Sequence, residues 1–283
     1  MSETLVSVWQ RARERLIAAG VDSPVLDARL LVEAGAGVSR LEIVTDPRRV
    51  LSGEQIAGVH ALVERRAARE PLSHIIGKKA FWTLELNVTP AVLTPRPETE
   101  FLVEAALGFV SPTTPSRVLD LGVGSGAVLL ALLAERDLAS GVGLDVSAEA
   151  LAVARGNAEM LKLDNRAEFH LGDWTTDFRE RFDLVLANPP YIPTAEIDAL
   201  APEVSKHEPR LALDGGHDGL DAYRAIIGRL NVWVKPNGAF AFEVGQGQSE
   251  AVGAMVKAAG HTLLAPRADL AGIPRVVSGR RVD

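Results

Sequence analysis

The chain has 283 residues, of which 47% are hydrophobic and 24% charged, a composition typical of globular proteins with room for one large and one small domain. Its formal net charge of −7 argues against broad binding to a phosphate backbone, so we expect no nucleic-acid partner. The lack of cysteine excludes disulfides, thiolate metal ligands and a cysteine nucleophile, and no apolar run approaches the roughly 20 residues of a membrane span. We expect a cytoplasmic monomer without membrane contacts.

Residues 1–74 are predicted to be helical throughout. Apolar residues recur at helical spacing from Leu5, and Gly20 ends that pattern. Further on, Ser39-Arg-Leu-Glu42 and Ser52-Gly-Glu-Gln55 both match the capping box, in which two side chains satisfy the first backbone donors of a helix. Since no residue of this stretch suggests chemistry, we interpret it as a small substrate-docking domain.

The helix after Ser52 is expected to reach Arg69. Its charged residues Glu64, Arg65 and Arg66 then fall, with Arg69, on the face opposite the apolar stripe. We interpret this arginine cluster as a solvated surface, with a partner-binding surface as the alternative.

Residues 75–93 are predicted to form a β-hairpin connection. Apolar residues alternate with polar ones from Trp82 to Val88, which is typical of a strand with one buried face. This strand is expected to pair with Val92-Leu93 or with the segment before it.

The sequence Thr94-Pro-Arg-Pro-Glu-Thr-Glu100 predicts an extended entry into a helix that continues to Leu107, because each proline restricts the backbone. The start of a helix is enough to explain both prolines and the early carboxylates. Whether Arg96 and Glu98 also contact a cofactor stays open.

Residues 117–126 predict a strand that runs into a glycine-rich turn, and a helix is expected to follow. Gly122, Gly124 and Gly126 would let the backbone pass close to a ligand at the N-terminus of that helix. The turn alone is ambiguous, because Gly122-x-Gly124-x-x-Ala127 also satisfies the dinucleotide-binding fingerprint of oxidoreductases.

Carboxylates follow the next two predicted strands. Asp145 ends one strand, where an acidic side chain would bind both ribose hydroxyls of an adenosine-containing ligand; capping of the next helix is the alternative. Asp173 and Trp174 follow the strand at residues 167–171. A carboxylate and an indole there would bind the amino group and the face of an adenine ring.

The fourth strand, residues 182–187, leads into Asn188-Pro189-Pro190-Tyr191. Proline lacks an N–H and cannot continue a β-ladder, so the Asn188 side-chain oxygen and the Pro189 carbonyl are left as acceptors beside the Tyr191 ring. Two acceptors and an aromatic surface suit a flat group that carries an NH2. A strand that ends in an ordinary proline-rich turn is the alternative.

The remaining chain predicts a helix at residues 223–230, a strand at 239–243, a helix that ends at Gly260, and two final strands at 261–265 and 274–278. With the four strands above, this pattern predicts a doubly wound α/β fold with a seven-stranded, mostly parallel sheet. Ligands bind at the carboxyl ends of such strands, where the residues singled out above lie. His170 and His261 have no acidic or histidine partner at ligand spacing, so we expect no metal site.

The glycine turn and the Asn-Pro-Pro-Tyr sequence, in this order, resemble class I S-adenosylmethionine-dependent methyltransferases that act on planar nitrogens. The whole chain is further similar to the peptide chain release factor N5-glutamine methyltransferase family. The chain departs from the pattern of that family at His74, His207 and Val123; the first two bear on substrate-side packing, whereas the backbone makes the contacts of the third. The segments that carry the resemblance are Glu70-Pro-Leu-Ser-His-Ile-Ile-Gly77, Thr89-Pro90, residues 94–100, Asn188-Pro-Pro-Tyr-Ile192, Glu208-Pro-Arg-Leu-Ala-Leu213 and Asp214-Gly-Gly-His-Asp-Gly-Leu-Asp221.

The resemblance implies methyl transfer from S-adenosylmethionine, which leaves S-adenosylhomocysteine, to the side-chain nitrogen of the Gln in the Gly-Gly-Gln loop of class 1 release factors, in support of translation termination. Residues 1–74 would dock the release factor, and residues 94–283 would form the methyltransferase domain. Asn188, Pro189 and Tyr191 would be catalytic and, together with Pro190, would hold the Gln. The cofactor would be held by Gly122, Val123, Gly124, Ser125, Gly126, Asp145, Asp173, Trp174 and Asn188.

Two alternatives stay open. An enzyme that methylates N6 of adenine in nucleic acids would present a similar NH2 to the same two acceptors, although the acidic charge balance argues against it. A non-catalytic adaptor would bind the cofactor without using it.

Overall fold

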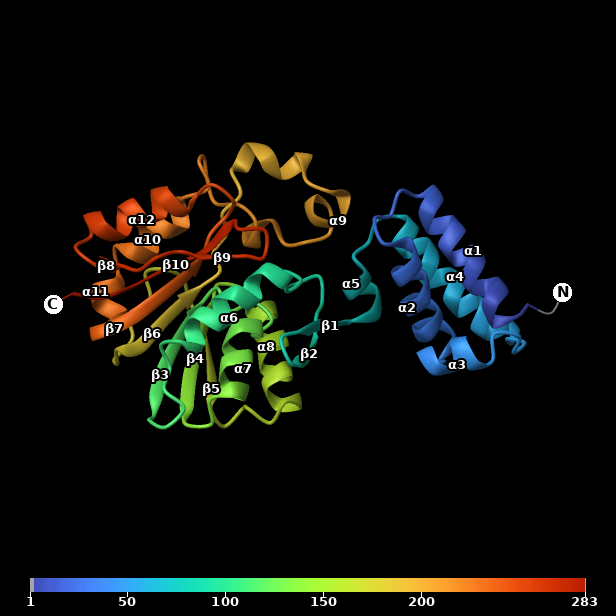
Figure 1. The fold of residues 1–283 in the computed structure, drawn as a ribbon, viewed down its shortest axis with the longest axis horizontal. Helices are drawn as coiled ribbons and strands as arrows, with labels where there is room; N and C mark the ends of the chain where they lie inside the picture. The colour runs from blue at the N-terminus through green and yellow to red at the C-terminus, as the bar shows by residue number, and fades with distance from the viewer. Residues whose placement is uncertain (1–2, 283) are drawn as a thin grey trace. The chain divides into compact units, whose positions relative to one another are not determined.

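The computed structural model describes residues 3–282, which form two compact units (Figure 1). The helical unit contains the chain up to Gly77 together with Ala201–His207. The sheet unit contains Lys78–Leu200 and the chain from Glu208 onward. Within the described residues, no helix is both long and apolar enough to cross a lipid bilayer.

The described part of the sheet unit contains a sheet built from β3 (Ser116–Leu121), β4 (Ala139–Asp145), β5 (Ala167–Leu171), β6 (Phe182–Ala187), β7 (Val234–Glu243), β8 (Thr262–Leu263), β9 (Arg267–Ala268) and β10 (Pro274–Arg280). Seven strands follow the order β5-β4-β3-β6-β7-β10-β8, and β9 pairs with β10. Neighbours from β5 to β7 are parallel, whereas β10 is antiparallel to β7 and β8. The predicted mostly parallel sheet is confirmed. The winding reverses between β3 and β6, where ligands bind in such sheets.

Helices cover both faces of this sheet (Figure 1). Successive side chains of a strand point to opposite faces. Val118 of β3 therefore packs with the helices on one face, among them α7 (Ala127–Glu135). Leu119 packs with those on the other, among them α12 (Ser249–Ala258). The helix predicted at 223–230 ends earlier, at Ile227, because Gly228 follows and glycine is a poor helix former. The helices on the first face are α6 (Glu100–Leu107), α7 and α8 (Ala148–Met160); those on the second are α10 (Asp221–Ile227), α11 (Leu230–Trp233) and α12. Short helical turns are η1 (Pro97–Thr99), η2 (Thr194–Ala199) and η3 (Arg210–Ala212).

The helical unit consists of α1 (Leu5–Ala18), α2 (Pro24–Ala36), α3 (Arg40–Thr45), α4 (Gly53–Ala67), α5 (Leu72–Ile76) and α9 (Pro202–Ser205). Both predicted capping boxes, at Ser39 and Ser52, are present. Helices α2 and α4 approach each other closely at two glycines, where a Cβ atom on Gly58 would lie 2.6 Å from the carbonyl oxygen of Gly35. Any larger residue at either position would push the two backbones apart.

Strands β1 (Lys78–Phe81) and β2 (Leu84–Asn87) form an antiparallel hairpin, so β2 pairs with the segment before it, one of the two expected partners. The strand predicted from Trp82 begins at Leu84 because Trp82 occupies the turn with a φ of 55°. The buried Asn157 side chain of α8 bonds the backbone N–H and carbonyl of Asn87, at 2.8 and 2.9 Å, and the carbonyl of Ser125 at 2.9 Å. The Asn157 side chain therefore links the hairpin to the glycine turn.

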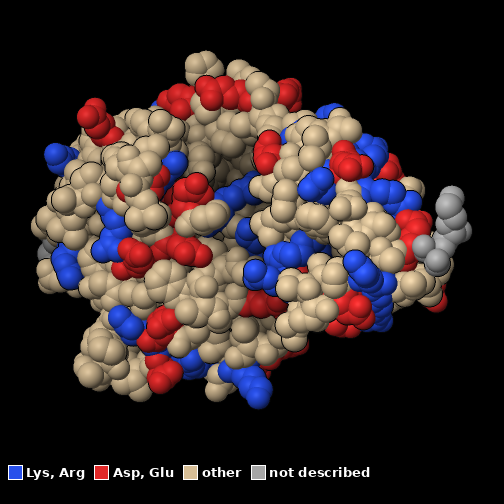
Figure 2. All heavy atoms as spheres, turned by 45° about the vertical axis from the view of Figure 1, so that its right-hand side comes forward, with Lys and Arg blue, Asp and Glu red and all other residues tan. Residues whose placement is uncertain are grey.

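Charged side chains of both signs are mixed over the face of the molecule drawn in Figure 2. Many charges form ion pairs at the surface, such as Arg117 with Glu168 and Glu180. Exposed pairs of this kind contribute only about 0–1 kcal/mol each to stability.

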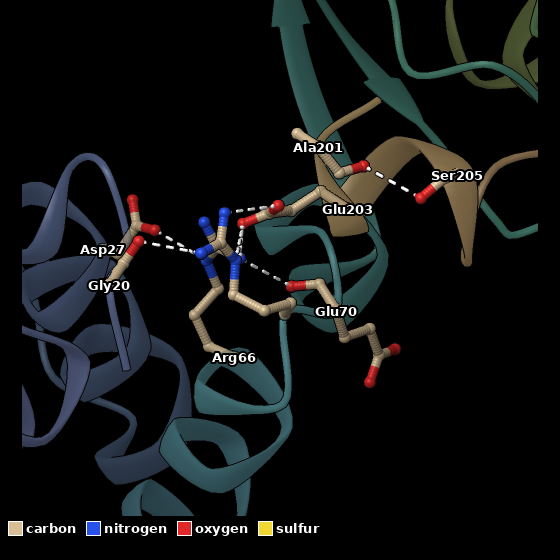
Figure 3. Close-up of polar contacts among 8 residues, drawn as sticks. Gly20, Asp27, Arg66, Glu70, Ala201, Glu203 and Ser205 are labelled. Atoms are coloured by element: carbon tan, nitrogen blue, oxygen red, sulfur yellow. Dashed lines mark hydrogen bonds and ion pairs between the residues drawn. The ribbon is translucent and has the colours of Figure 1, made fainter. Parts of the chain in front are cut away.

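The prediction that Arg66 lies on a solvated surface is wrong. Arg66 is 7% exposed, and its guanidinium donates to Asp27 at 2.7 Å and to Glu203 at 2.9 Å (Figure 3). Arg69 donates to both oxygens of Glu203, at 2.6 and 2.8 Å. Arg69 also has a φ of 71°, which is why α4 ends at Ala67 and does not reach it. Glu203 thus holds residues 201–207 against the helical unit. The observed helical unit therefore contains this later segment, which the expected domain of residues 1–74 does not.

We predict that Glu203 stabilises the helical unit in a pH-dependent way. Partial burial raises the pKa of Glu203, but hydrogen bonds from Arg69 and Arg66 outweigh it and lower the pKa to about 2. The stabilisation is therefore complete above the ordinary glutamate pKa of 4.5 and is lost as the pH falls from there towards 2. Glu203→Gln should reduce the free energy of unfolding by about 1–3 kcal/mol at pH 6, and the difference from the unsubstituted protein should vanish near pH 2.

Urea unfolding followed by circular dichroism at pH 6, 4 and 2.5 would measure this difference. Glu14→Gln, a change on an exposed face of α1, is the matched control and should have little effect at any of these pH values. A constant difference for Glu203→Gln across the range would contradict the ion-pair account.

Candidate active site

A cavity of about 540 Å3 lies in the sheet unit at the carboxyl ends of β3, β4 and β6. Its position matches the switch in winding between β3 and β6. Predicted site residues that line it are Gly122, Val123, Gly124, Ser125, Asp145, Trp174, Asn188 and Pro190. Predicted site residues outside its lining are Gly126, Asp173, Pro189 and Tyr191.

The glycine turn is held against the end of β4. The backbone N–H groups of Gly122 and Val123 both donate to the Leu144 carbonyl, at 2.8 and 3.0 Å. A Cβ atom on Gly122 would lie 3.3 Å from the Trp174 ring, and the φ of 73° there also favours glycine. Glycine at this position keeps the floor of the cavity open beside the indole. Gly126 has a different task, since its φ of 85° turns the chain into α7.

Asp145 is fixed at the rim of the cavity by two backbone donors. Its Oδ2 accepts from the Gly124 N–H at 2.9 Å, and its Oδ1 accepts from the Ser147 N–H at 2.9 Å. Ser147, and not Asp145, caps α8, so the capping alternative for Asp145 is excluded. A carboxylate has about four acceptor positions, and the two unused ones are available to hydroxyl groups of a ligand.

Asp173 and Trp174 separate in the structure. The Asp173 carboxylate is exposed and accepts from the Thr175 hydroxyl at 2.6 Å and the Thr175 N–H at 2.8 Å, which holds the pKa of Asp173 below its ordinary value. This is the geometry of a local turn, in which an aspartate bonds the backbone two residues on. Of the two residues, Trp174 lines the cavity.

Asn188 follows β6 directly and is half-buried. Its Nδ2 donates to the Thr99 hydroxyl at 3.2 Å. Within residues 3–282, neither the Asn188 Oδ1 nor the Pro189 carbonyl accepts a hydrogen bond. Asn188 lines the cavity, so its oxygen is available to a ligand there, whereas Pro189 is buried and lies outside the lining.

The backbone of Tyr191 is clamped between two later segments. Its carbonyl accepts from the Gln248 side chain at 2.8 Å, and a Cβ atom on Gly219 would come within 2.3 Å of that carbonyl. A Cβ atom on Gly215 would likewise lie 2.8 Å from the Tyr191 Cα. The glycines of the segment at 214–221 are thus needed for close packing against the Asn-Pro-Pro-Tyr corner. Burial raises the pKa of Tyr191 to about 12, so its hydroxyl stays protonated at neutral pH.

Several lining residues were not assigned from the sequence. Arg96, whose role was left open, lines the cavity and pairs with the buried Glu208 at 2.5 Å, whereas Glu98 is not among the lining residues. Asp120, at the end of β3, lines it as well, and burial raises the pKa of Asp120 to about 7. Their positions in the sequence could have indicated a place in the site, since Asp120 lies near the end of a predicted strand and Arg96 lies in the two-proline sequence. Other lining residues include Pro90, Val92, Leu93, Pro95, Thr99 and Leu211.

Apart from its place at the end of a predicted strand, nothing in the sequence indicated that Glu243 belongs to the site. Strand β7 pairs with β6 so that Phe242 lies opposite Ala187, which brings Glu243 level with Asn188. Glu243 is 2% exposed, and its carboxylate accepts a hydrogen bond from the Thr99 hydroxyl. Burial raises the pKa of Glu243 to about 7, although the bond from Thr99 works against that rise.

Comparison with known proteins places the chain in a family. A family described as "PrmC N-terminal domain" matches residues 7–77, and one described as "Methyltransferase small domain" matches residues 99–215. A protein named release factor glutamine methyltransferase from Caulobacter vibrioides is 55% identical over 99% of this chain and 97% of its own length. Proteins of the same name from Rhodospirillum rubrum and Bradyrhizobium diazoefficiens are 43% and 42% identical, over 96% and 99% of this chain and 83% and 96% of their own lengths. The chain belongs to the release factor glutamine methyltransferase family.

Proposed function

We propose that this methyltransferase moves the methyl group of S-adenosylmethionine to the side-chain amide nitrogen of the Gln in the Gly-Gly-Gln loop of class 1 peptide chain release factors. One observation carries the proposal above all. Asn188 and Pro190 of the Asn188-Pro-Pro-Tyr corner line the same cavity as the glycine turn and Asp145, and the Asn188 Oδ1 has no hydrogen-bond donor among the described residues. The names of the relatives support the same reaction.

The cavity residues fit the cofactor. A volume of about 540 Å3 is within the roughly 300–1,000 Å3 of small-molecule sites. The backbone at Gly122 and Gly124 would lie against the cofactor, Asp145 would accept from its ribose hydroxyls, and Trp174 would cover its adenine. When bound, S-adenosylmethionine supplies an electrophilic methyl group on a sulfonium.

The acceptor pair accounts for the choice of an amide nitrogen. Such a nitrogen is a weak nucleophile because its lone pair is delocalised into the carbonyl. The Asn188 Oδ1 and the Pro189 carbonyl would each accept one of its hydrogens and hold the nitrogen in line for attack. Both bonds strengthen as positive charge grows on nitrogen, so they stabilise the transition state more than the bound Gln.

The remaining residues of the corner would shield the reaction. Pro190 lines the cavity, and the Tyr191 ring packs against the core cluster on one face of the sheet, so both would exclude water from the reacting atoms. A methylated amide nitrogen that still carries both hydrogens is strongly acidic and loses one proton to solvent. No basic side chain is required for that step.

The helical unit is our candidate for docking the release factor. The described residues from Leu5 to Ile75 carry no group that the proposed chemistry uses, yet they form a core of their own. Residues 94–283 would then supply the catalytic half. A docking unit would bring the Gly-Gly-Gln loop to the cavity with the affinity of a larger surface.

A methyl-transfer assay tests the proposal. The full chain is incubated with S-adenosylmethionine and either a class 1 release factor or adenine-containing DNA, and products are analysed by mass spectrometry. We expect one added methyl group on the peptide that contains the Gly-Gly-Gln loop and none on DNA. Methylated DNA with an unchanged release factor would reverse the assignment.

We predict that Asn188→Ala lowers kcat by about 100-fold or more, because one of the two acceptors is lost from the transition state. The affinity for S-adenosylmethionine should change by less than about threefold. Single-turnover kinetics and calorimetry measure the two quantities. Asn165→Ala, an exposed asparagine change away from the cavity, is the matched control. Near-normal turnover of Asn188→Ala would remove Asn188 from the mechanism.

For Asp145→Ala we predict the opposite pattern, in which the affinity for the cofactor changes more than kcat. This change should weaken cofactor binding by roughly 10- to 100-fold, since hydrogen bonds to a charged group contribute about 1.5–3 kcal/mol. Calorimetric titration with S-adenosylhomocysteine measures it, with the exposed Asp164→Ala as control. An unchanged Kd in a variant that still melts cooperatively would show that Asp145 does not contact the cofactor.

A further inference from the structure

Thr99 lies between the Asn188 side chain and a buried carboxylate. It is 4% exposed, at the end of η1, and its Oγ1 lies 3.2 Å from the Asn188 Nδ2. A hydrogen bond from the same hydroxyl also lowers the pKa of the Glu243 carboxylate, which is 2% exposed, against the effect of burial. Three polar groups from η1, β7 and the end of β6 therefore form one continuous chain of hydrogen bonds.

The direction of this chain is set by how many hydrogens each group has. Above its pKa of about 7, the Glu243 carboxylate is ionised and only accepts, so Thr99 donates its single hydroxyl hydrogen to Glu243. The Thr99 oxygen is then left as an acceptor for Asn188, and an acceptor can face only the NH2 end of the amide. Because the two ends of an amide are opposed, the Asn188 Oδ1 is turned away from Thr99.

An asparagine without such a partner would have no fixed orientation. Its terminal torsion is broad and roughly two-fold, so the oxygen and the NH2 group exchange places at little cost. An NH2 group turned towards the substrate would face the hydrogens of the amide to be methylated and would accept neither of them. Only one of the two orientations supports the reaction.

The cost of burying Glu243 argues against a purely structural role. Its Oε2 is buried and has no hydrogen-bond partner among the described residues. A buried acceptor in this state costs about 1–3 kcal/mol, and a well-packed apolar side chain would avoid that cost. Residues that lower stability in this way are typical of functional sites.

We propose that Thr99 and Glu243 are positioning residues that orient the Asn188 amide, with its oxygen towards the substrate nitrogen. This inference rests on the proposed function and adds two residues to it. Neither residue accepts or donates a proton in the reaction. Both act through Asn188, and of these three residues only Asn188 would contact the Gln.

The first test compares Thr99→Val, which keeps the shape and removes the hydroxyl, with Thr99→Ser, which keeps the hydroxyl. The full chain is assayed with a release factor and S-adenosylmethionine at pH 8, above the raised pKa of Glu243 of about 7. We expect Thr99→Val to lower kcat by about 10- to 100-fold, with the KM for the release factor changed less than about threefold. Thr99→Ser should recover most of this loss, and the exposed Thr114→Val is the control.

The second test asks whether Thr99 acts through Asn188. In an Asn188→Ala background, Thr99→Val should have no further effect on kcat, since there is no amide left to orient. Losses that multiply in the double variant would mean that Thr99 acts independently, which would overturn the inference.

A third variant keeps the inference testable if Thr99→Val does not fold. Glu243→Met replaces the carboxylate with an apolar chain of similar length, so it should melt at the same or a higher temperature while kcat falls by about tenfold. Lower stability with normal kcat would assign Glu243 a structural role only. If both Thr99→Val and the unsubstituted enzyme turn over normally, the positioning role is contradicted and the proposed function is not. If the unsubstituted enzyme does not methylate a release factor, both the proposed function and this inference are contradicted.

Discussion

The abrupt end of β6 is the constraint on which the site depends. Two prolines cannot donate to a sheet, so the ladder stops and the carbonyl and side-chain oxygens at the corner have no strand to bond. Such a corner keeps one shape only if other segments hold it. Gln248 and the closely packed Gly215 and Gly219 do so from one side. Thr99 holds the Asn188 side chain from another.

Polar groups are buried around this corner at a cost to stability. Burial raises the pKa of both Asp120 and Glu243 to about 7, which means that their charged forms are poorly solvated. The sheet can bear this cost because its two apolar cores lie on either side of β3 and β6. The chain therefore concentrates its least favourable contacts where a ligand or a substrate would use them.

The charge cluster at Arg66 is a different use of buried polar groups. Here the buried guanidinium of Arg66 is paired with two carboxylates, those of Asp27 and Glu203. Such a cluster specifies which segment packs where, because leaving one charge unpaired would be expensive. It selects residues 201–207, a short piece of chain that follows the Asn-Pro-Pro-Tyr corner and η2, as part of the helical unit.

The sequence by itself determined whatever depends on neighbours along the chain: the capped helices, the positions of the parallel strands, the glycine turn, the proline corner and the strand that ends at Asp145. Each rests on backbone conformation or on a spacing of a few residues. Tertiary structure decided the burial of Arg66, whose partner Glu203 is 137 positions away, the turn that occupies Asp173, and the hydrogen bond between Thr99 and Asn188, 89 positions apart. A single sequence carries no mark of such pairs, because a hydrogen-bond partner is chosen by distance in space and not by distance along the chain.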